Sequence, residues 1–170
     1  MNIKLIALAA CAGYGIWFTA VGGRQLNTEH VAALYQNYAS AYDRGDGKAV
    51  CDLFSDDVHG RFSSTSRSMP VNEVVTKASV CSSVDDFYRS KKQLEEALGR
   101  ELYTNIEYTI NSITIAPDKK SATAEILMEM RIGTEQAALL DMRSTQIDVI
   151  KRSFGKAQFV QSDGSVSFYK

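Results

Sequence analysis

Neither sign of charge dominates the sequence, because 19 lysine and arginine residues stand against 20 aspartate and glutamate residues. The sequence has no basic excess to attract nucleic acid, so we expect no nucleic-acid partner. The sequence also lacks a glycine-rich phosphate loop, a nucleophile elbow and an HExxH motif. We therefore expect no cofactor.

Metal-binding patterns are missing as well. The three cysteines lack the close spacing of a zinc site. The acidic stretch DRGDGKAVCDLFSDDV (residues 43–58) lacks the alternating oxygen ligands and closing glutamate of a calcium loop. The sequence predicts no metal site.

One long apolar run is present, at residues 5–21, and it carries no charge. It is long for the core of a signal peptide and at the lower limit for a membrane-spanning helix. Small residues at 20–22 suit a cleavage site, and Leu8–Cys11 resembles a lipobox. A cleaved signal, a retained inner-membrane anchor and lipidation at Cys11 therefore all stay open. We predict a leader over 1–23 and one domain over 24–170.

This leader predicts an exported protein. Lys4 precedes the apolar run, which by the positive-inside tendency puts the rest of the chain outside the cytoplasm, most simply in a bacterial periplasm. Two cysteines, Cys51 and Cys81, remain once the leader is set aside. In an oxidising compartment they are expected to form a disulfide, and two buried free thiols are the alternative.

Helical patterns fill the first half of the domain. Asn27 or Thr28 can cap a helix whose apolar stripe includes Tyr35, Tyr38 and Tyr42, and Gly45 ends it. Asp46 caps a second, short helix. After a strand at 58–64, we predict a helix starting at Ser68–Pro70 with its apolar positions at Val71, Val74, Val75 and Ala78. A further helix is predicted from Ser83 to about Leu102, with inward positions Phe87, Leu94, Leu98 and Leu102.

From Thr104 onward the apolar residues recur at every second position, which is typical of strands. The alternation slips at Asn111-Ser112, which predicts a β-bulge. A turn at 117–120 leads into a half-buried strand at 122–132, and two more strands join around 153–155. The fold class is therefore α+β, with helices packed in the hollow of a curved antiparallel sheet.

One segment carries a family resemblance. The stretch QNYASAYDRGDGKAVCDLFSDDV (residues 36–58), together with the pair of strands around Gly155, resembles the NTF2-like or SnoaL-like superfamily, a cystatin-like α+β cone that includes ketosteroid isomerase. The resemblance implies a tyrosine that donates to an oxyanion at Tyr38. It places the general base of the isomerases at Phe62 and their second donor near Ser144, and neither residue can do that work.

Candidate site residues follow from this comparison and from the polar residues themselves. The catalytic candidates are Tyr38, His59 beside Asp57, and Asp148 in the middle of a strand. We expect Asp148 to point outward, because the neighbouring odd positions Ile147 and Val149 are apolar. The residues expected to line the cone and bind a ligand are Tyr38, Phe62, Met128 and Met130.

The sequence favours a non-catalytic function. We expect an exported or membrane-tethered module that either binds a small apolar ligand or acts as an interaction protein. In the second case the open sheet face would contact another copy or a membrane-complex partner. An isomerase or dehydratase that uses Tyr38 with His59 or Asp148 is the enzymatic alternative, and the sequence leaves it open.

Overall fold

A computed structural model describes residues 22–64, 72–134 and 137–169. The apolar run at 5–21, Cys11 and the predicted helix start at 68–71 lie outside these ranges. The elements, in chain order, are η1 (Gly22–Arg24), α2 (Thr28–Asp43), α3 (Gly47–Asp52), β1 (Phe54–Ser64), β2 (Asn72–Val75), α4 (Lys77–Leu98), β3 (Tyr103–Ile115), β4 (Ser121–Thr134), β5 (Ala137–Ser153) and β6 (Lys156–Tyr169). Of the helices in the described ranges, none has the length and apolar character to cross a membrane.

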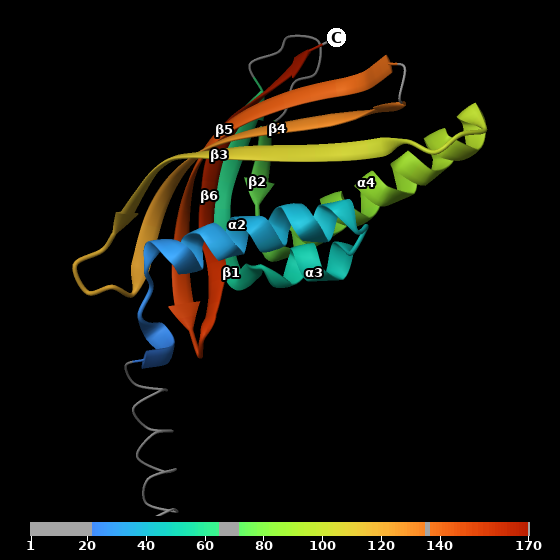
Figure 1. Cartoon of the computed structure of the whole chain (residues 1–170). Coiled ribbons are helices and arrows are strands. Elements are labelled where there is room, and N and C mark those ends of the chain that lie inside the picture. Colours follow the sequence, from blue (N-terminus) through green and yellow to red (C-terminus); the bar gives the residue numbers. More distant parts are fainter. Residues whose placement is uncertain (1–21, 65–71, 135–136, 170) are drawn as a thin grey trace, which may run out of the picture.

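The strands form one six-stranded sheet in the order β2-β1-β6-β5-β4-β3. The sheet curves, and the three α-helices lie in its hollow (Figure 1), as the α+β pattern predicts. Neighbouring strands run antiparallel except β1 and β6, which are parallel. The prediction of an antiparallel sheet was therefore wrong at this pair. The two strands lie far apart in the sequence and no hairpin connects them, so they are free to pair in parallel.

The predicted helix–corner–helix unit is confirmed. The Asn27 side chain accepts a hydrogen bond from the amide of His30 (2.9 Å) and caps α2. Gly45 has a φ of 69°, the left-handed conformation that glycine adopts without steric cost. Asp46 then accepts from the amide of Ala49 (2.9 Å) and starts α3. This corner turns the chain so that both helices face the sheet.

The region predicted as two helices is a strand and a single long helix. Residues 72–75 pair with β1, with Val75 buried and Val74 on the outside, so the two valines alternate between faces instead of sharing a helical stripe. The helix α4 begins at Lys77, because Thr76 and Ser79 form a reciprocal capping box. The capping pattern proposed at Ser83 lies inside this helix.

The second half of α4 extends beyond the edge of the cone (Figure 1). Leu94 and Leu98 are 41% and 40% exposed, so the prediction that they point inward was wrong. Phe87 packs against the core, and Leu102 is buried in the segment after the helix. The apolar residues do recur at helical spacing. However, no described element packs against the far end of the helix, so Leu94 and Leu98 stay exposed.

The strand pattern of the second half is confirmed. The register of β3 against β4 shifts at Asn111, where the bulge was predicted. On β4 the inner face is buried at every second position, by Ala122, Ala124, Ile126, Met128, Met130 and Ile132. These side chains form the floor of the core on which α2 packs.

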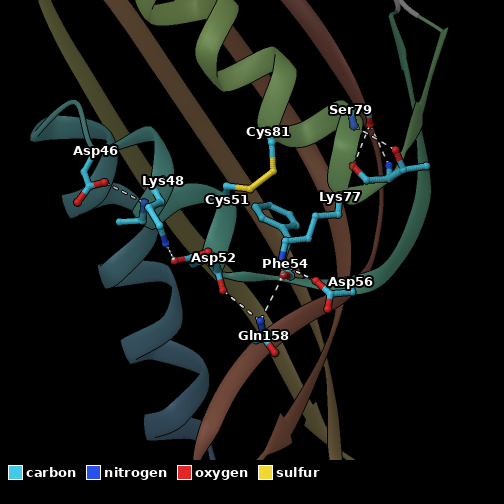
Figure 2. Close-up of a disulfide and its surroundings, with 12 residues drawn as sticks. Asp46, Lys48, Cys51, Asp52, Phe54, Asp56, Lys77, Ser79, Cys81 and Gln158 are labelled. Carbon is cyan, nitrogen blue, oxygen red and sulfur yellow. Dashed lines mark hydrogen bonds and ion pairs between the residues drawn. A yellow bond between two sulfur atoms is a disulfide. The ribbon is translucent and has the colours of Figure 1, made fainter.

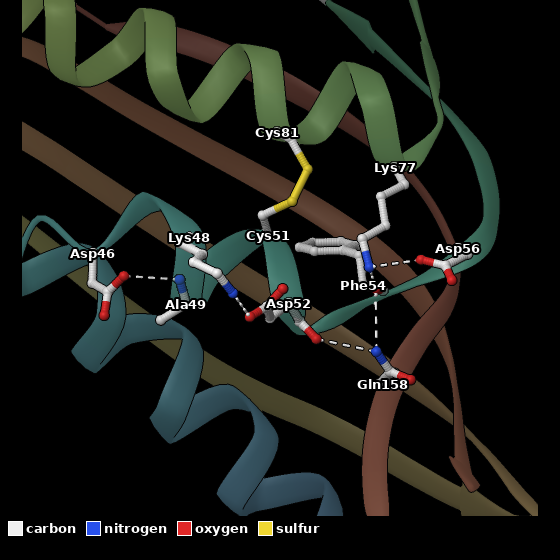
Figure 3. A network of polar contacts seen from close by, with 10 residues as sticks. All are labelled: Asp46, Lys48, Ala49, Cys51, Asp52, Phe54, Asp56, Lys77, Cys81 and Gln158. Atoms are coloured by element: carbon white, nitrogen blue, oxygen red, sulfur yellow. Dashed lines mark hydrogen bonds and ion pairs between the residues drawn. A yellow bond between two sulfur atoms is a disulfide. The ribbon is translucent and has the colours of Figure 1, made fainter.

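A disulfide joins α3 to α4 through Cys51 and Cys81, as predicted (Figure 2). Polar contacts around it tie the same two helices to the sheet (Figure 3). Lys77 donates to the carbonyl oxygen of Phe54 (2.8 Å) and to the carboxylate of Asp56 (3.0 Å). The Gln158 amide of β6 donates to that same carbonyl of Phe54 (3.3 Å). The start of α4 is therefore held in place by a covalent bond and by hydrogen bonds to main-chain atoms.

Candidate functional site

A cavity of about 210 Å³ lies between α2, the beginning of α4 and the inner face of the sheet. Most of its walls are apolar, and aromatic rings predominate: Tyr35, Tyr38, Tyr42, Phe54, Phe62 and Phe159. The rings pack edge to face or tilted, with centroids about 5 to 6 Å apart, as in Tyr38–Phe159 and Phe54–Phe159. Such packing gives the cavity rigid walls.

Asp148 of β5 provides the charged group on the sheet side of the cavity. It is only 1% exposed. Its Oδ2 accepts a hydrogen bond from the Tyr35 hydroxyl (2.6 Å) and another from the Gln146 amide (3.2 Å). Its Oδ1 accepts from the Ser162 hydroxyl (2.5 Å). All four residues line the cavity. Together they make one polar cluster on an otherwise apolar surface.

The strand register brings this cluster together. Asp148 lies opposite Ala124 on β4 and opposite Ser162 on β6. The small side chains of these two neighbours leave room for the carboxyl group and for the Tyr35 hydroxyl that reaches it from α2. The aromatic ring of Tyr35 packs against Tyr108 and Phe159, which fixes the direction of its hydroxyl.

Burial governs the acid–base properties of the site. Desolvation raises the pKa of Asp148 to about 6, and its hydrogen bonds from Ser162, Tyr35 and Gln146 oppose that rise only in part. Burial and the neighbouring carboxylate of Asp148 raise the pKa of Tyr35 far above its usual range. Burial also raises the pKa of Tyr38. At neutral pH the tyrosines are therefore hydrogen-bond donors, and Asp148 is the group that changes its charge.

The structure brings two of the three catalytic candidates into one cavity. Tyr38 and Asp148 both line it. His59 is exposed on β1, where its ring contacts the carbonyl oxygen of Asp57 (3.3 Å), and it does not line the cavity. The prediction that Asp148 points outward was wrong. The inner face of β5 continues through Ile150, which is fully buried, while Ile147 is half-exposed on the outer face.

Three of the four expected ligand-binding residues line the cavity, and one does not. Phe62 and Met128 line the cavity with Tyr38. Met130 is buried in the core and is not part of the lining, because it lies one inward position further along β4.

Three polar residues of the site were not identified from the sequence: Tyr35, Gln146 and Ser162. One pattern in the sequence could have identified two members of the cluster, Gln146 and Asp148. The inward positions of β5 read Met142, Ser144, Gln146, Asp148 and Ile150, so polar side chains interrupt an inner face that is apolar at both ends. Polar residues on the core side of a strand need partners, and such partners mark a site.

Polar groups also border the opposite side of the cavity. Glu73 of β2 is exposed and accepts a hydrogen bond from the Ser83 hydroxyl of α4 (3.1 Å). Ser79, Val80 and Val84 of α4 complete this wall. The disulfide and Lys77 hold the same turns of α4, so they position the wall without contacting the cavity.

Among the residues that the structure describes, the lining contains two carboxylates, Asp148 and Glu73, and no lysine, arginine or histidine. Within the described ranges, no cluster of three or more histidine, cysteine, aspartate or glutamate side chains could hold a metal ion. What the cluster offers chemically is a buried proton acceptor with hydroxyl donors beside it.

Comparison with known proteins gives the fold. No family model and no curated protein matches the sequence. The structure is similar to that of a conserved protein from Planctomyces limnophilus (15% identity, TM-score 0.57, covering 82% of this chain and 95% of that one). It is also similar to a ketosteroid isomerase-like protein from Erwinia carotovora atroseptica (15% identity, TM-score 0.54, 85% and 99% covered). An NTF-2 like protein of unknown function from Silicibacter pomeroyi is a third match (15% identity, TM-score 0.50, 82% and 97% covered). The chain therefore has the fold of the NTF2-like superfamily.

Proposed function

We propose that this protein binds a small, mainly apolar molecule that carries one hydrogen-bonding group. The observation that carries the proposal is the aromatic cavity with a single buried carboxyl cluster on one wall. An apolar pocket with a few convergent polar groups is the usual form of a small-molecule site. The apolar walls supply affinity, and the cluster of Asp148, Tyr35 and Ser162 selects and orients the polar group.

The size of the cavity limits the ligand. A cavity of about 150 Å³ accommodates benzene. By the same ratio, 210 Å³ accommodates about eight non-hydrogen atoms. One ring with a short substituent fits these dimensions, whereas a tetracyclic skeleton would have to extend past Glu73 into solvent.

The charge of the lining limits the ligand further. An anionic group would lie near the buried carboxylate of Asp148, in a region of low dielectric where like charges repel strongly, and Glu73 adds a second carboxylate at the exposed side. Above pH 6 Asp148 is ionised and accepts hydrogen bonds, so a hydroxyl or ammonium donor is favoured. The proposed ligands are therefore neutral alcohols, phenols or amines rather than acids.

Three molecules with the same carbon skeleton test this proposal: benzyl alcohol, benzylamine and benzoate. We expect the alcohol or the amine to raise the melting temperature and the acid to leave it unchanged at pH 7.5. The variant Asp148→Asn should bind the amine more weakly. The variant Asp141→Asn removes an acid from the outer face of the same strand, and it should bind like the unmodified protein. If none of the three molecules binds, or if the acid binds best, the proposal is wrong.

A second candidate function is acid–base catalysis of the isomerase or dehydratase type. The observation that favours it is a buried carboxyl group with hydroxyl donors beside it in the cavity. Burial raises the pKa of Asp148 to about 6, close to the operating pH of a general base. Its carboxylate could take a proton from a carbon next to a carbonyl group and return it to another carbon. Tyr38 lines the same cavity and could donate to the carbonyl oxygen. Loss of turnover in Asp148→Asn with unchanged binding of a neutral ligand would distinguish catalysis from binding alone.

We also propose that the protein works outside the cytoplasm, either tethered through residues 5–21 or released. The Cys51–Cys81 disulfide supports an oxidising compartment. Association through the open sheet face has less support. The outer face of β4 and β5 carries cross-strand ion pairs, Arg143 with Glu129 and Arg131 with Asp141, which favour contact with water.

A further inference from the structure

The point at which residues 1–21 join the described chain lies beside two hairpin turns. The amide of Gly155 in the β5–β6 turn donates to the carbonyl oxygen of Gly23 (2.8 Å). The amide of Leu26 donates to the carbonyl oxygen of Lys119 in the β3–β4 turn (2.7 Å). These bonds fix η1 and the two turns at one end of the sheet (Figure 1). We call this surface, made of residues 22–26, 117–120 and 151–156, the basal end.

A large aromatic side chain is exposed at the tip of the basal end. Phe154 is 67% exposed, the highest value among the exposed large hydrophobic residues of the described chain. It also has a φ of 50° in a two-residue turn with Gly155. A bulky residue in this conformation costs about 1 to 2 kcal/mol, and asparagine or glycine is the residue that such turns favour. Phe154 is therefore unfavourable in two ways, through its exposure and through its backbone conformation, and most of its side chain is not packed against the fold.

Basic residues surround this phenylalanine. The basal end carries Arg24, Lys119, Lys120, Lys151, Arg152 and Lys156. The acids on or beside it are Glu29, Asp52, Asp57 and Asp118, and Asp52 already forms an ion pair with Lys48. The chain as a whole has a net charge of −1, so the basal end is a local positive region on a nearly neutral protein.

We propose that the basal end lies against a bilayer surface that contains anionic lipids. An exposed aromatic residue among lysines suits the headgroup region of a membrane, where the ring enters the interface and the ammonium groups meet phosphates. Each basic residue near such a surface contributes about 1 kcal/mol. The uncharged apolar run at 5–21 joins the domain at this same end, so the chain enters the domain at the end that carries Phe154. The proposed contact with the bilayer involves only residues of the basal end, so it does not depend on whether the leader is cleaved.

Depth-dependent fluorescence quenching tests the proposal on the full chain. Trp17 is the only tryptophan, so the double variant Trp17→Phe, Phe154→Trp reports on the turn alone. In vesicles of phosphatidylcholine with about one-third phosphatidylglycerol, we expect a blue-shifted emission and quenching by lipids brominated on their acyl chains. In pure phosphatidylcholine the quenching should be less than half as strong. Adding Lys119→Glu and Lys120→Glu should lower it in the anionic vesicles as well.

The matched control places the tryptophan at the far end of the same strand. Leu139 is 49% exposed and lies fifteen residues before Phe154, about 50 Å along the chain at the usual rise of a strand. In Trp17→Phe, Leu139→Trp the emission should remain that of a water-exposed ring. Equal quenching at both positions, equal quenching in neutral and anionic vesicles, or a water-exposed emission from the Phe154→Trp variant in anionic vesicles would each overturn the proposal.

A second variant separates membrane contact from a structural role. Phe154→Asn gives the turn the Asn-Gly sequence that its conformation favours. Without lipid, we expect its melting temperature to rise by about 3 °C. If the melting temperature falls instead, Phe154 stabilises the fold itself, and the reasoning from its exposure and conformation is wrong.

Discussion

Replacing the buried acid by its neutral isostere, Asp148→Asn, should change how the stability of the protein depends on pH. Asp148 has a pKa of about 6 in the folded chain and an ordinary value of 3.8. The folded protein therefore binds this proton more tightly than the unfolded chain does. Where the folded state holds more protons, raising the pH lowers stability. The loss begins near pH 3, as the unfolded chain starts to ionise, and is complete by about pH 7, when both states are ionised.

The magnitude follows from the size of the shift. A difference of about 2.2 units, at 1.36 kcal/mol per unit, corresponds to about 3 kcal/mol. Asparagine at this position has no proton to lose. The free energy of unfolding of Asp148→Asn, minus that of the unmodified protein, should therefore rise by about 3 kcal/mol between pH 3 and pH 7.5. The other acids are the same in both proteins, so the subtraction removes most of their contribution.

Urea denaturation followed by circular dichroism at half-unit steps of pH measures this difference. Asp141→Asn serves as the control for the loss of one negative charge, because Asp141 lies on β5 but is paired with Arg131 at the surface. A stability difference that stays constant with pH, or that falls as the pH rises, would refute the reasoning. Water would then reach Asp148, and the polar cluster would not be buried.

Three further predictions concern one residue of the polar cluster and two features that hold the surrounding fold together. Tyr35→Phe removes a hydrogen bond that lowers the pKa of Asp148, so carbon NMR of the carboxyl group should show a pKa above 6, and urea denaturation at pH 7.5 should show a loss of about 1.5 to 3 kcal/mol. Reduction of the Cys51–Cys81 disulfide, which closes a separation of 30 residues, should lower the unfolding free energy by about 3.5 kcal/mol; serine at both positions should reproduce this loss and make the protein insensitive to reductant. Gly60→Ala should lower the unfolding free energy by at least about 3 kcal/mol. Gly60 has a φ of 152°, and a Cβ there would lie 1.8 Å from the carbonyl oxygen of Ser162 on β6. A smaller loss of unfolding free energy in the same denaturation assay would mean that β1 can move away from β6.

Local rules were sufficient for much of the fold. The Asn27 cap, the Gly45 corner and the Asp46 cap each depend on a few neighbouring residues, and each appears where the sequence places it. The bulge at Asn111 is local in the same sense, since a change of phase within one strand reveals it. Such features depend on backbone conformation and near neighbours, and these are readable from a single sequence.

Features that depend on distant partners were harder to predict. The segment around Val74 and Val75 has an apolar spacing that suits either a helix or an edge strand, and only its pairing with β1 decides between them. The parallel pairing of β1 with β6 is likewise set by the closure of the whole sheet. Leu94 has the spacing of a core residue, but whether anything covers it depends on where the sheet ends.

The polar cluster shows why a binding site is the least predictable part of such a fold. Around Asp148 both faces of β5 contain apolar residues, with Val149 on one face and Ile150 on the other, so local alternation does not assign the faces. The register assigns them, because Ala124 and Ser162 lie opposite Asp148 and Tyr35 is close enough to donate to it. The ionised carboxylate would be too costly to bury without its hydrogen-bond donors. These donors are Tyr35 of α2, Gln146 of β5 and Ser162 of β6, so the orientation of Asp148 depends on residues from three elements. Evolution can therefore change such a site by altering one donor, with little change in the apolar pattern that specifies the cone.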